Sequence, residues 1–123
     1  PAHTEHAPEP IGPYSQAIRA GNTVYLSGQI PLDPATMELV PGDVKAQVAQ
    51  VFRNLAAVAA AAGTTLDAAV KLTVYLTDLA NFGHVNDAMA NVFHEPYPAR
   101  ATVQVSALPK GALVEVDAVL ILD

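Results

Sequence analysis

The sequence predicts an α+β domain in which two helices pack on one face of a mixed β-sheet. Apolar residues recur at helical spacing over residues 43–62 and again over 82–94. Residues 70–77 alternate strictly between apolar and polar, which indicates a strand with one buried face. Residues 113–122 are almost continuously apolar and rich in β-branched side chains, which is typical of a central strand.

The chain begins with an irregular segment and a hairpin. Residues 1–10 contain three prolines and no periodicity, so we expect an irregular N-terminal arm. Strands over 15–20 and 23–29 flank a Gly-Asn turn, which is typical of a β-hairpin. Gly28 interrupts the alternation of the second strand, which predicts a bulge or a close approach of two backbones.

The first helix has clear ends. Asp43 is placed to cap its first turn, and Gly63 is placed to end it. The apolar stripe defines the buried face, and we expect Gln47, Gln50 and Asn54 to lie away from it.

Apolar positions also predict the buried sides of the next two elements. Val70 is expected to share the buried face of its strand with Leu72, and Phe82 opens the apolar stripe of the second helix. With the hairpin and the two strands that follow the second helix, the element order becomes ββαβαββ.

Arg100 stands where a proline-rich corner becomes a strand. Pro96 and Pro98 stop the second helix, and alternation then resumes from Ala101. An arginine held at such a point can offer its planar guanidinium to a carboxylate or a phosphate. A salt bridge at the surface is the alternative interpretation.

The composition excludes several classes of function. The chain has 123 residues, which we expect to form one domain, residues 1–123. A net charge of −6 and the absence of a basic run argue against nucleic-acid binding. No apolar run is long enough to span a membrane, so a cytoplasmic location is expected. No cysteine is present, which excludes disulfides and thiol nucleophiles.

The chain is unusually apolar for its size. Hydrophobic residues make up 51% and charged residues only 15%, although a domain of this length has a limited interior. Some apolar surface is therefore expected to face another subunit, which predicts a homo-oligomer.

Three motifs, in order along the chain, resemble the reactive-intermediate imine deaminase family (RidA, the YjgF type). They are IGPYSQA at 11–17, SGQIP at 27–31, and PAR at 98–100 followed by a Val-x-Val strand and LPKGALVEVDA at 108–118. The resemblance implies a chorismate-mutase-like fold and a homotrimer with sites in clefts between subunits. It also implies that short 2-imino acids are hydrolysed to 2-oxo acids and ammonia, without a cofactor.

The resemblance also implies roles for particular residues. Arg100 binds the substrate carboxylate, Glu115 assists the attack of water, and Tyr14 completes the catalytic set. The substrate-binding residues are Arg100, Ser27, Gly28, Asn86 and Thr102, the last at a position where many relatives carry cysteine.

Without the resemblance, these residues have simpler interpretations. Tyr14 is a packing tyrosine, and Asn86 is an exposed polar residue of a helix. Glu115 and Asp117 share one face of a buried strand, where lysine or arginine of another subunit could pair with them. We interpret Asp117 as structural.

The sequence leaves other functions open, apart from those that need a metal ion. Four histidines, at positions 3, 6, 84 and 94, lack the spacing of metal ligands, so no metal site is expected. A relative that binds small carboxylates without turnover, or one that cleaves RNA or inhibits translation, is an alternative. A tautomerase that uses the amine of Pro1 as a base is a lesser one.

Overall fold

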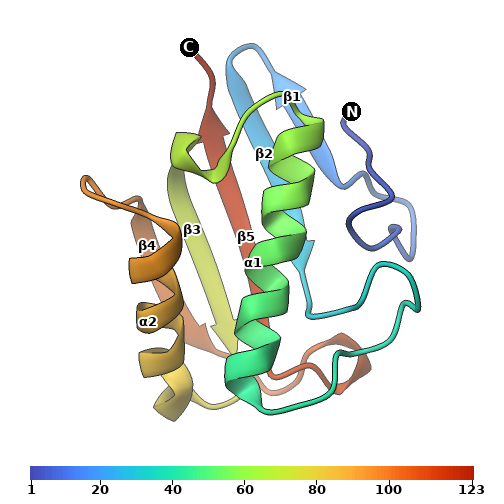
Figure 1. Cartoon of the computed structure of the whole chain (residues 1–123), viewed down its shortest axis with the longest axis vertical. Helices are drawn as coiled ribbons and strands as arrows, with labels where there is room; N and C mark the ends of the chain where they lie inside the picture. Colours follow the sequence, from blue (N-terminus) through green and yellow to red (C-terminus); the bar gives the residue numbers. More distant parts are fainter.

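Five strands form a single mixed sheet in the order β1-β2-β5-β3-β4 (Figure 1). The computed structural model describes residues 1–123. The predicted order of elements and the α+β class are confirmed. Three 3-10 turns, at Leu66–Ala68, Leu79–Asn81 and Pro109–Gly111, are additional. The strands and helices are β1 (Ala17–Ala20), β2 (Thr23–Gln29), α1 (Val44–Ala61), β3 (Ala69–Leu76), α2 (Phe82–Val92), β4 (Ala99–Gln104) and β5 (Val114–Ile121).

β5 occupies the centre of the sheet. It pairs antiparallel with β2 on one side and with β3 on the other, whereas β4 pairs parallel with β3 at the edge. The central position predicted for this apolar strand is therefore confirmed.

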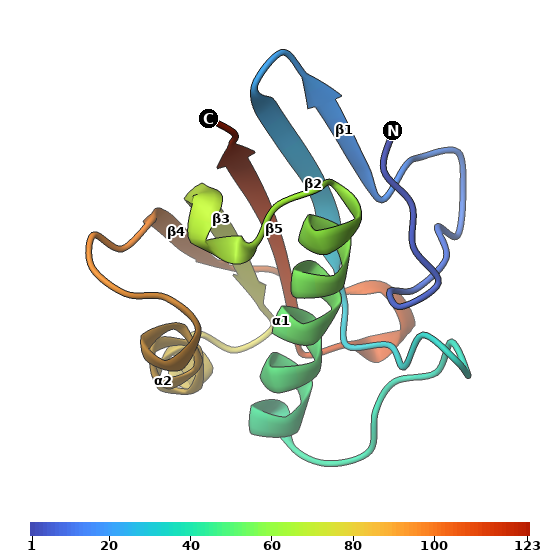
Figure 2. The same cartoon turned by 45° about the horizontal axis from the view of Figure 1, so that its top comes forward.

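Both helices cover the same face of the sheet, which we call the helix face (Figures 1 and 2). The core lies between them and the sheet, and alternate residues of β5 point into it because side chains of a strand alternate between faces. Val114, Val116 and Leu120 are fully buried there. The residues between them, among them Glu115 and Asp117, point to the opposite face, which we call the open face. Neither helix has the length and apolarity needed to cross a lipid bilayer.

The first helix begins and ends where its capping residues predict. The Asp43 carboxylate accepts a hydrogen bond from the Ala46 N–H at 3.1 Å, which satisfies one of the free amides of the first turn. Gly63 follows the C-cap with φ +86°, a left-handed conformation that glycine adopts without steric cost.

The expected orientation of three polar residues of α1 is wrong. Gln47, Gln50 and Asn54 are at most 9% exposed. The Asn54 amide donates to two carbonyls of the loop that follows β2, and the Gln47 Oε1 accepts from the Leu113 N–H at 2.9 Å. Loops therefore cover sides of α1 that the apolar periodicity predicted to be exposed to solvent. The side-chain amides form hydrogen bonds with the backbone groups that are buried under these loops.

Two apolar residues expected in the core are about half exposed. The pairing of β3 with β5 shifts register between Ala69 and Lys71, which takes Val70 out of the alternation. Phe82 is the first residue of α2 and lies outside the packed stretch that starts at Val85.

The hairpin and the irregularity in its second strand are both confirmed. Ala20 pairs with Thr23 across the two-residue turn, and Gly21 in that turn has φ +62°. The pairing of β2 with β5 shifts register between Leu26 and Gln29, so the bulge includes Gly28.

Candidate functional site

Glu115 lies on the open face, near the start of the central strand β5. Its register partner on β3 is Tyr75, and the next residue of β5 on this face is Asp117, whose Oδ2 accepts a hydrogen bond from the Tyr75 hydroxyl at 3.0 Å. Burial raises the pKa of the Glu115 carboxyl above its ordinary value, and the negative charge of Asp117 adds to this shift. The carboxyl is therefore poised to hold a proton closer to neutral pH than an exposed glutamate.

The bulge at Gly28 makes room for the Glu115 carboxyl. A Cβ atom at position 28 would lie 2.5 Å from Glu115 Oε2 and 2.9 Å from its Cδ. Any side chain at this position would therefore displace the carboxyl group. The sequence predicts a bulge or a close approach of two backbones at Gly28. The bulge is present, and the group that lies close to Gly28 is the side chain of Glu115.

A cavity of about 300 Å³ opens beside this carboxyl, and we call it the Glu115 cavity. Tyr14 and Gly28 line it with Glu115, and so do Glu9 and Lys110. The Tyr14 side chain is about half exposed, and its hydroxyl oxygen accepts a hydrogen bond from the Ile11 N–H at 3.2 Å. The cavity therefore combines a half-buried carboxyl, a phenol and one ammonium group.

Ser27 is next to this cavity in sequence but does not line it. Its hydroxyl donates to the Ser15 carbonyl at 2.5 Å, and its N–H donates to the Gln16 carbonyl. Both donors of Ser27, which the resemblance makes a substrate-binding residue, are thus used within the chain.

Arg100 lies on the helix face at the edge of the sheet. Its register partner is the core residue Leu72, and its Nη1 donates to Asn86 Oδ1 on α2 at 2.5 Å. The same nitrogen lies 3.5 Å from the sulfur of Met89. Arg100, Asn86, Met89 and Tyr97 line a pocket of about 240 Å³, which we call the Arg100 pocket.

The guanidinium of Arg100 has no anionic partner within the chain. The two ion pairs of the protein join His3 to Glu9 and His94 to Asp67. The surface salt bridge, which was the simpler interpretation of Arg100, is therefore absent, and its charge remains available to a ligand carboxylate.

Thr102 follows Arg100 on the same side of β4, paired with the core residue Val74. Its hydroxyl oxygen is buried and has no hydrogen-bond partner. The predicted binding residues Arg100, Asn86 and Thr102 thus lie together, at the helix face of the β4 edge.

A single chain does not bring the two groups of predicted site residues together. Glu115 and Arg100 lie on opposite faces of the sheet, on strands separated by β3. Glu115 and Arg100 of the same chain therefore do not form one site. Three hollows are larger than the Glu115 cavity. Those of about 380 Å³ between the helices and about 690 Å³ beside His94 contain none of the predicted residues, and one of about 350 Å³ beside the arm contains Tyr14 alone of them. No group of three or more histidine, aspartate or glutamate side chains is arranged to hold a metal ion.

Two polar residues, Lys110 and Gln16, are among the residues of the Glu115 cavity that were not predicted from the sequence. Lys110 is its only lysine or arginine, and it has φ +58°, a left-handed conformation that is uncommon outside glycine. Gln16 is buried at the cavity wall. Both belong to the motifs that carry the resemblance, but no periodicity or spacing marks them as site residues.

The chain is similar to proteins of one family over nearly its whole length. The family model described as Endoribonuclease L-PSP matches residues 4–122. A RutC family protein of Pyrococcus horikoshii is 52% identical, covering 94% of this chain and 92% of the relative. The mouse protein named 2-iminobutanoate/2-iminopropanoate deaminase is 45% identical, covering 96% and 87%. The crystal structure of RidA from a Psychrobacter species superposes with a TM-score of 0.94 at 51% identity, covering 98% of both chains. With a match of this extent in sequence and in fold, the chain belongs to the RidA (YjgF) family.

Proposed function

We propose that this protein is a hydrolytic deaminase that converts short 2-imino acids to 2-oxo acids and ammonia. The observation that carries the proposal is the Glu115 carboxyl, half-buried beside a cavity, with a raised pKa and a glycine opposite it. Relatives 43–45% identical from mite, mouse and cattle bear the name of this activity, which supports it further.

The chemistry needs only a carboxyl group and water. A protonated imine is already electrophilic at carbon. Water positioned by the Glu115 carboxylate therefore adds to the C=N carbon and gives up a proton to the carboxylate. The carboxylic acid then returns this proton to the amino nitrogen. As the C–N bond breaks and ammonia leaves, the carboxylate takes the proton of the carbinolamine hydroxyl, which becomes the ketone oxygen, and passes this proton to the departing ammonia. A carboxyl with a raised pKa suits both steps, because efficient acid–base catalysts titrate near the working pH.

In this proposal, Arg100 makes the enzyme specific for imines that carry a carboxylate next to the imine carbon. Its free guanidinium can take the substrate carboxylate in a bidentate pair, with Asn86 holding Nη1 in place. Since Glu115 and Arg100 of one chain lie on opposite faces, the site requires Arg100 of one copy and Glu115 of another.

Apolar side chains of the open face support an assembly of this kind. Ile18, Tyr25, Val103 and Ile121 are each more than 40% exposed on strands of the sheet. Such a patch is typical of a surface that another subunit covers. We propose the homotrimer that the family resemblance implies, with sites between neighbouring chains.

The first test of this assembly measures the mass of the oligomer and asks whether two inactive variants recover activity when they assemble together. Light scattering at micromolar concentration should give about three times the chain mass of 12.8 kDa. Co-expression of inactive Arg100→Ala and Glu115→Gln chains should restore about one quarter of wild-type activity, because random assortment pairs an intact Arg100 with an intact Glu115 at that frequency. Either variant expressed alone serves as the control. A stable monomer, or no recovery in mixed trimers, would exclude the shared site.

A second prediction concerns the glycine opposite Glu115. Gly28→Ala should lower kcat/KM roughly 10- to 100-fold, because even a misplacement of about 1 Å can cost this much in rate. The melting temperature should change little, since the flexible end of Glu115 moves and not the strands. Gly83→Ala is the control: nothing lies within 4 Å of its Cβ position on α2. It should keep full activity and melt at the same or a higher temperature. Equal activity of both variants would show that the position of the carboxyl does not matter.

The decisive experiment generates the imine in place and follows its decay. An amino-acid oxidase or a pyridoxal-phosphate dehydratase supplies the 2-imino acid, and its disappearance is compared with the spontaneous rate. Acceleration that saturates with substrate supports the deaminase. A protein that only binds carboxylates would take up 2-oxobutanoate and leave the imine lifetime unchanged.

The RNA-cleaving alternative remains testable beside it, since the description of the family model names an endoribonuclease. A net charge of −6 gives no electrostatic attraction to phosphates, so we expect no RNA binding at physiological salt. Salt-dependent RNA binding with cleavage would favour that alternative.

A further inference from the structure

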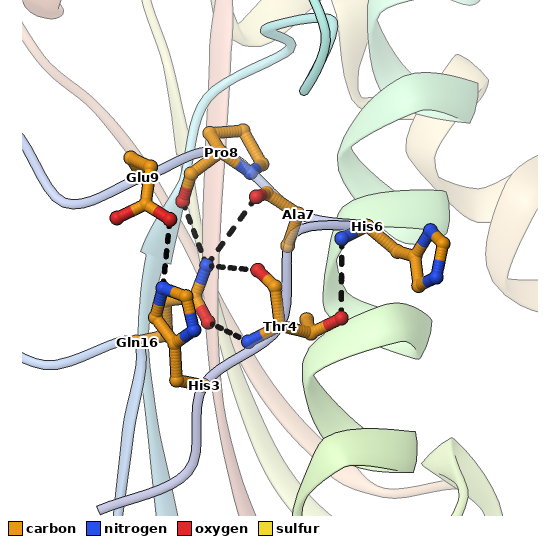
Figure 3. A network of polar contacts seen from close by, with 7 residues as sticks. All are labelled: His3, Thr4, His6, Ala7, Pro8, Glu9 and Gln16. Carbon is orange, nitrogen blue, oxygen red and sulfur yellow. Dashed lines mark hydrogen bonds and ion pairs between the residues drawn. The ribbon is translucent and has the colours of Figure 1, made fainter.

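The N-terminal arm has an irregular path. Its start is held by a backbone bridge from Ala2 to Ala17, and the rest is held by the side chain of Gln16 (Figure 3). The Gln16 Oε1 accepts from the Thr4 N–H at 2.8 Å. Its Nε2 donates to the carbonyls of Thr4, Ala7 and Pro8 at 3.0, 3.3 and 2.9 Å. Gln16 is 1% exposed, so these bonds are shielded from water.

Every hydrogen-bonding atom of this amide is satisfied by the backbone of the arm. Within the arm only Ala7 and Pro8 are buried, and both offer their carbonyls to Gln16. A buried amide that lost these partners would be left without water to replace them, so the bonded path is strongly preferred. A second contact, from His3 Nε2 to Glu9 Oε1 at 2.7 Å, draws the two ends of the arm together.

The segment that Gln16 holds forms one wall of the Glu115 cavity. Pro8 and Glu9 of the arm line the cavity, together with Lys110 and Pro109 of the turn that precedes β5. Gln16 lines it as well. The extent of this cavity of about 300 Å³ therefore depends on the position of the arm.

We propose that Gln16 is a positioning residue that fixes the arm as a wall of the Glu115 cavity, and that this wall limits the length of the ligand side chain. The inference rests on the proposed function for its ligand class, short 2-imino acids and their 2-oxo products. A short apolar side chain fits in the cavity without contacting the arm, whereas a long one reaches Pro8 and has to displace the arm against the Gln16 hydrogen bonds.

The test measures binding, so that it does not depend on turnover. 2-Oxobutanoate and 2-oxooctanoate are titrated calorimetrically into the wild-type protein and into Gln16→Met, which keeps the length of the side chain and removes its hydrogen bonds. We expect the wild type to prefer the short acid and the ratio of the two affinities to change at least 10-fold in the variant. Amide hydrogen exchange over residues 3–9 should accelerate in Gln16→Met.

A second variant of Gln16 allows the same test if Gln16→Met folds poorly, and a variant of another buried glutamine serves as the control. An ionised glutamate accepts hydrogen bonds but donates none, so Gln16→Glu should release the arm at neutral pH and recover part of its protection when the carboxyl is protonated. Gln47→Met is the control, because it removes one hydrogen bond from an equally buried glutamine that touches no part of the cavity. It should leave the affinity ratio unchanged.

The outcomes separate this inference from the proposed function. An unchanged affinity ratio, or unchanged exchange of the arm in both Gln16 variants, would overturn the inference. If neither acid binds to the wild type, the inference falls as well, whereas imine hydrolysis could still be observed. If the acids bind with the expected ratios but no imine is hydrolysed, the proposed function fails and the role of Gln16 stands.

Discussion

Glu115→Gln is expected to slow imine hydrolysis by roughly 10²–10⁴-fold, the usual contribution of a general acid–base group. Glutamine fills the same space beside Gly28 but can neither take a proton from water nor return one to nitrogen. Binding of 2-oxobutanoate should stay close to that of the wild type, because the product carboxylate binds at Arg100. The measurement is single-turnover decay of the imine, with calorimetry for the product.

The same variant should be more stable than the wild type at neutral pH. Since burial and Asp117 raise the pKa of Glu115 in the folded state, the folded protein holds this proton more tightly than the unfolded chain. Stability is therefore lost as the pH rises from the unfolded pKa to the folded one. Glutamine removes this loss, so Glu115→Gln should melt at a higher temperature above the raised pKa and equal the wild type below about pH 4.

Glu38→Gln is the matched control, because Glu38 is an exposed carboxylate that lines neither the Glu115 cavity nor the Arg100 pocket. It should change neither activity nor the pH dependence of melting. If Glu115→Gln keeps at least half of the wild-type rate, the proton transfers must be assigned to another group.

Arg100→Lys is expected to lower kcat/KM roughly 10- to 150-fold, although the positive charge is kept. Lysine cannot form the bidentate pair, and each charge-assisted hydrogen bond is worth about 1.5–3 kcal/mol. At about 1.4 kcal/mol per factor of ten, the loss of one bond gives this range. Arg100→Ala should be worse and should abolish binding of the 2-oxo acid as well.

An uncharged substrate separates carboxylate recognition from structural damage. An imino amide has no carboxylate to pair, so wild type, Arg100→Lys and Arg100→Ala should hydrolyse it at similar rates. Near wild-type hydrolysis of the imino acid by both variants, with a normal oligomer, would make Arg100 a structural residue. The deaminase proposal would then lose its basis for choosing α-acids.

Much of the fold could be predicted because its signals are local. Alternation and helical spacing depend on residues close together in sequence, and they located all five strands and both helices. The capping carboxylate of Asp43 and the glycine at position 63 act within one turn of their own helix. The length and apolar content of β5 indicated its central position, because a strand with neighbours on both sides has little exposed surface.

The candidate site was predictable in its residue types and not in its arrangement. The alternation of β5 correctly placed Glu115 and Asp117 on one face, and the broken alternation at Gly28 correctly predicted a bulge. The sequence could not show that Arg100 points to the other face, because this depends on β4 pairing parallel with β3, in a register set between segments almost 30 residues apart.

The sequence by itself determined the elements, their order, the capped ends of α1 and the face of the sheet that carries the acidic pair. Only the tertiary structure decided which polar residues are buried, as for Gln16, Gln47 and Asn54. A buried amide is stable only where distant backbone groups come within hydrogen-bonding distance, and such partners exist only after the loops and the arm have packed. For the same reason, the separation of Arg100 from Glu115 follows from strand pairing, a long-range property that no local pattern records.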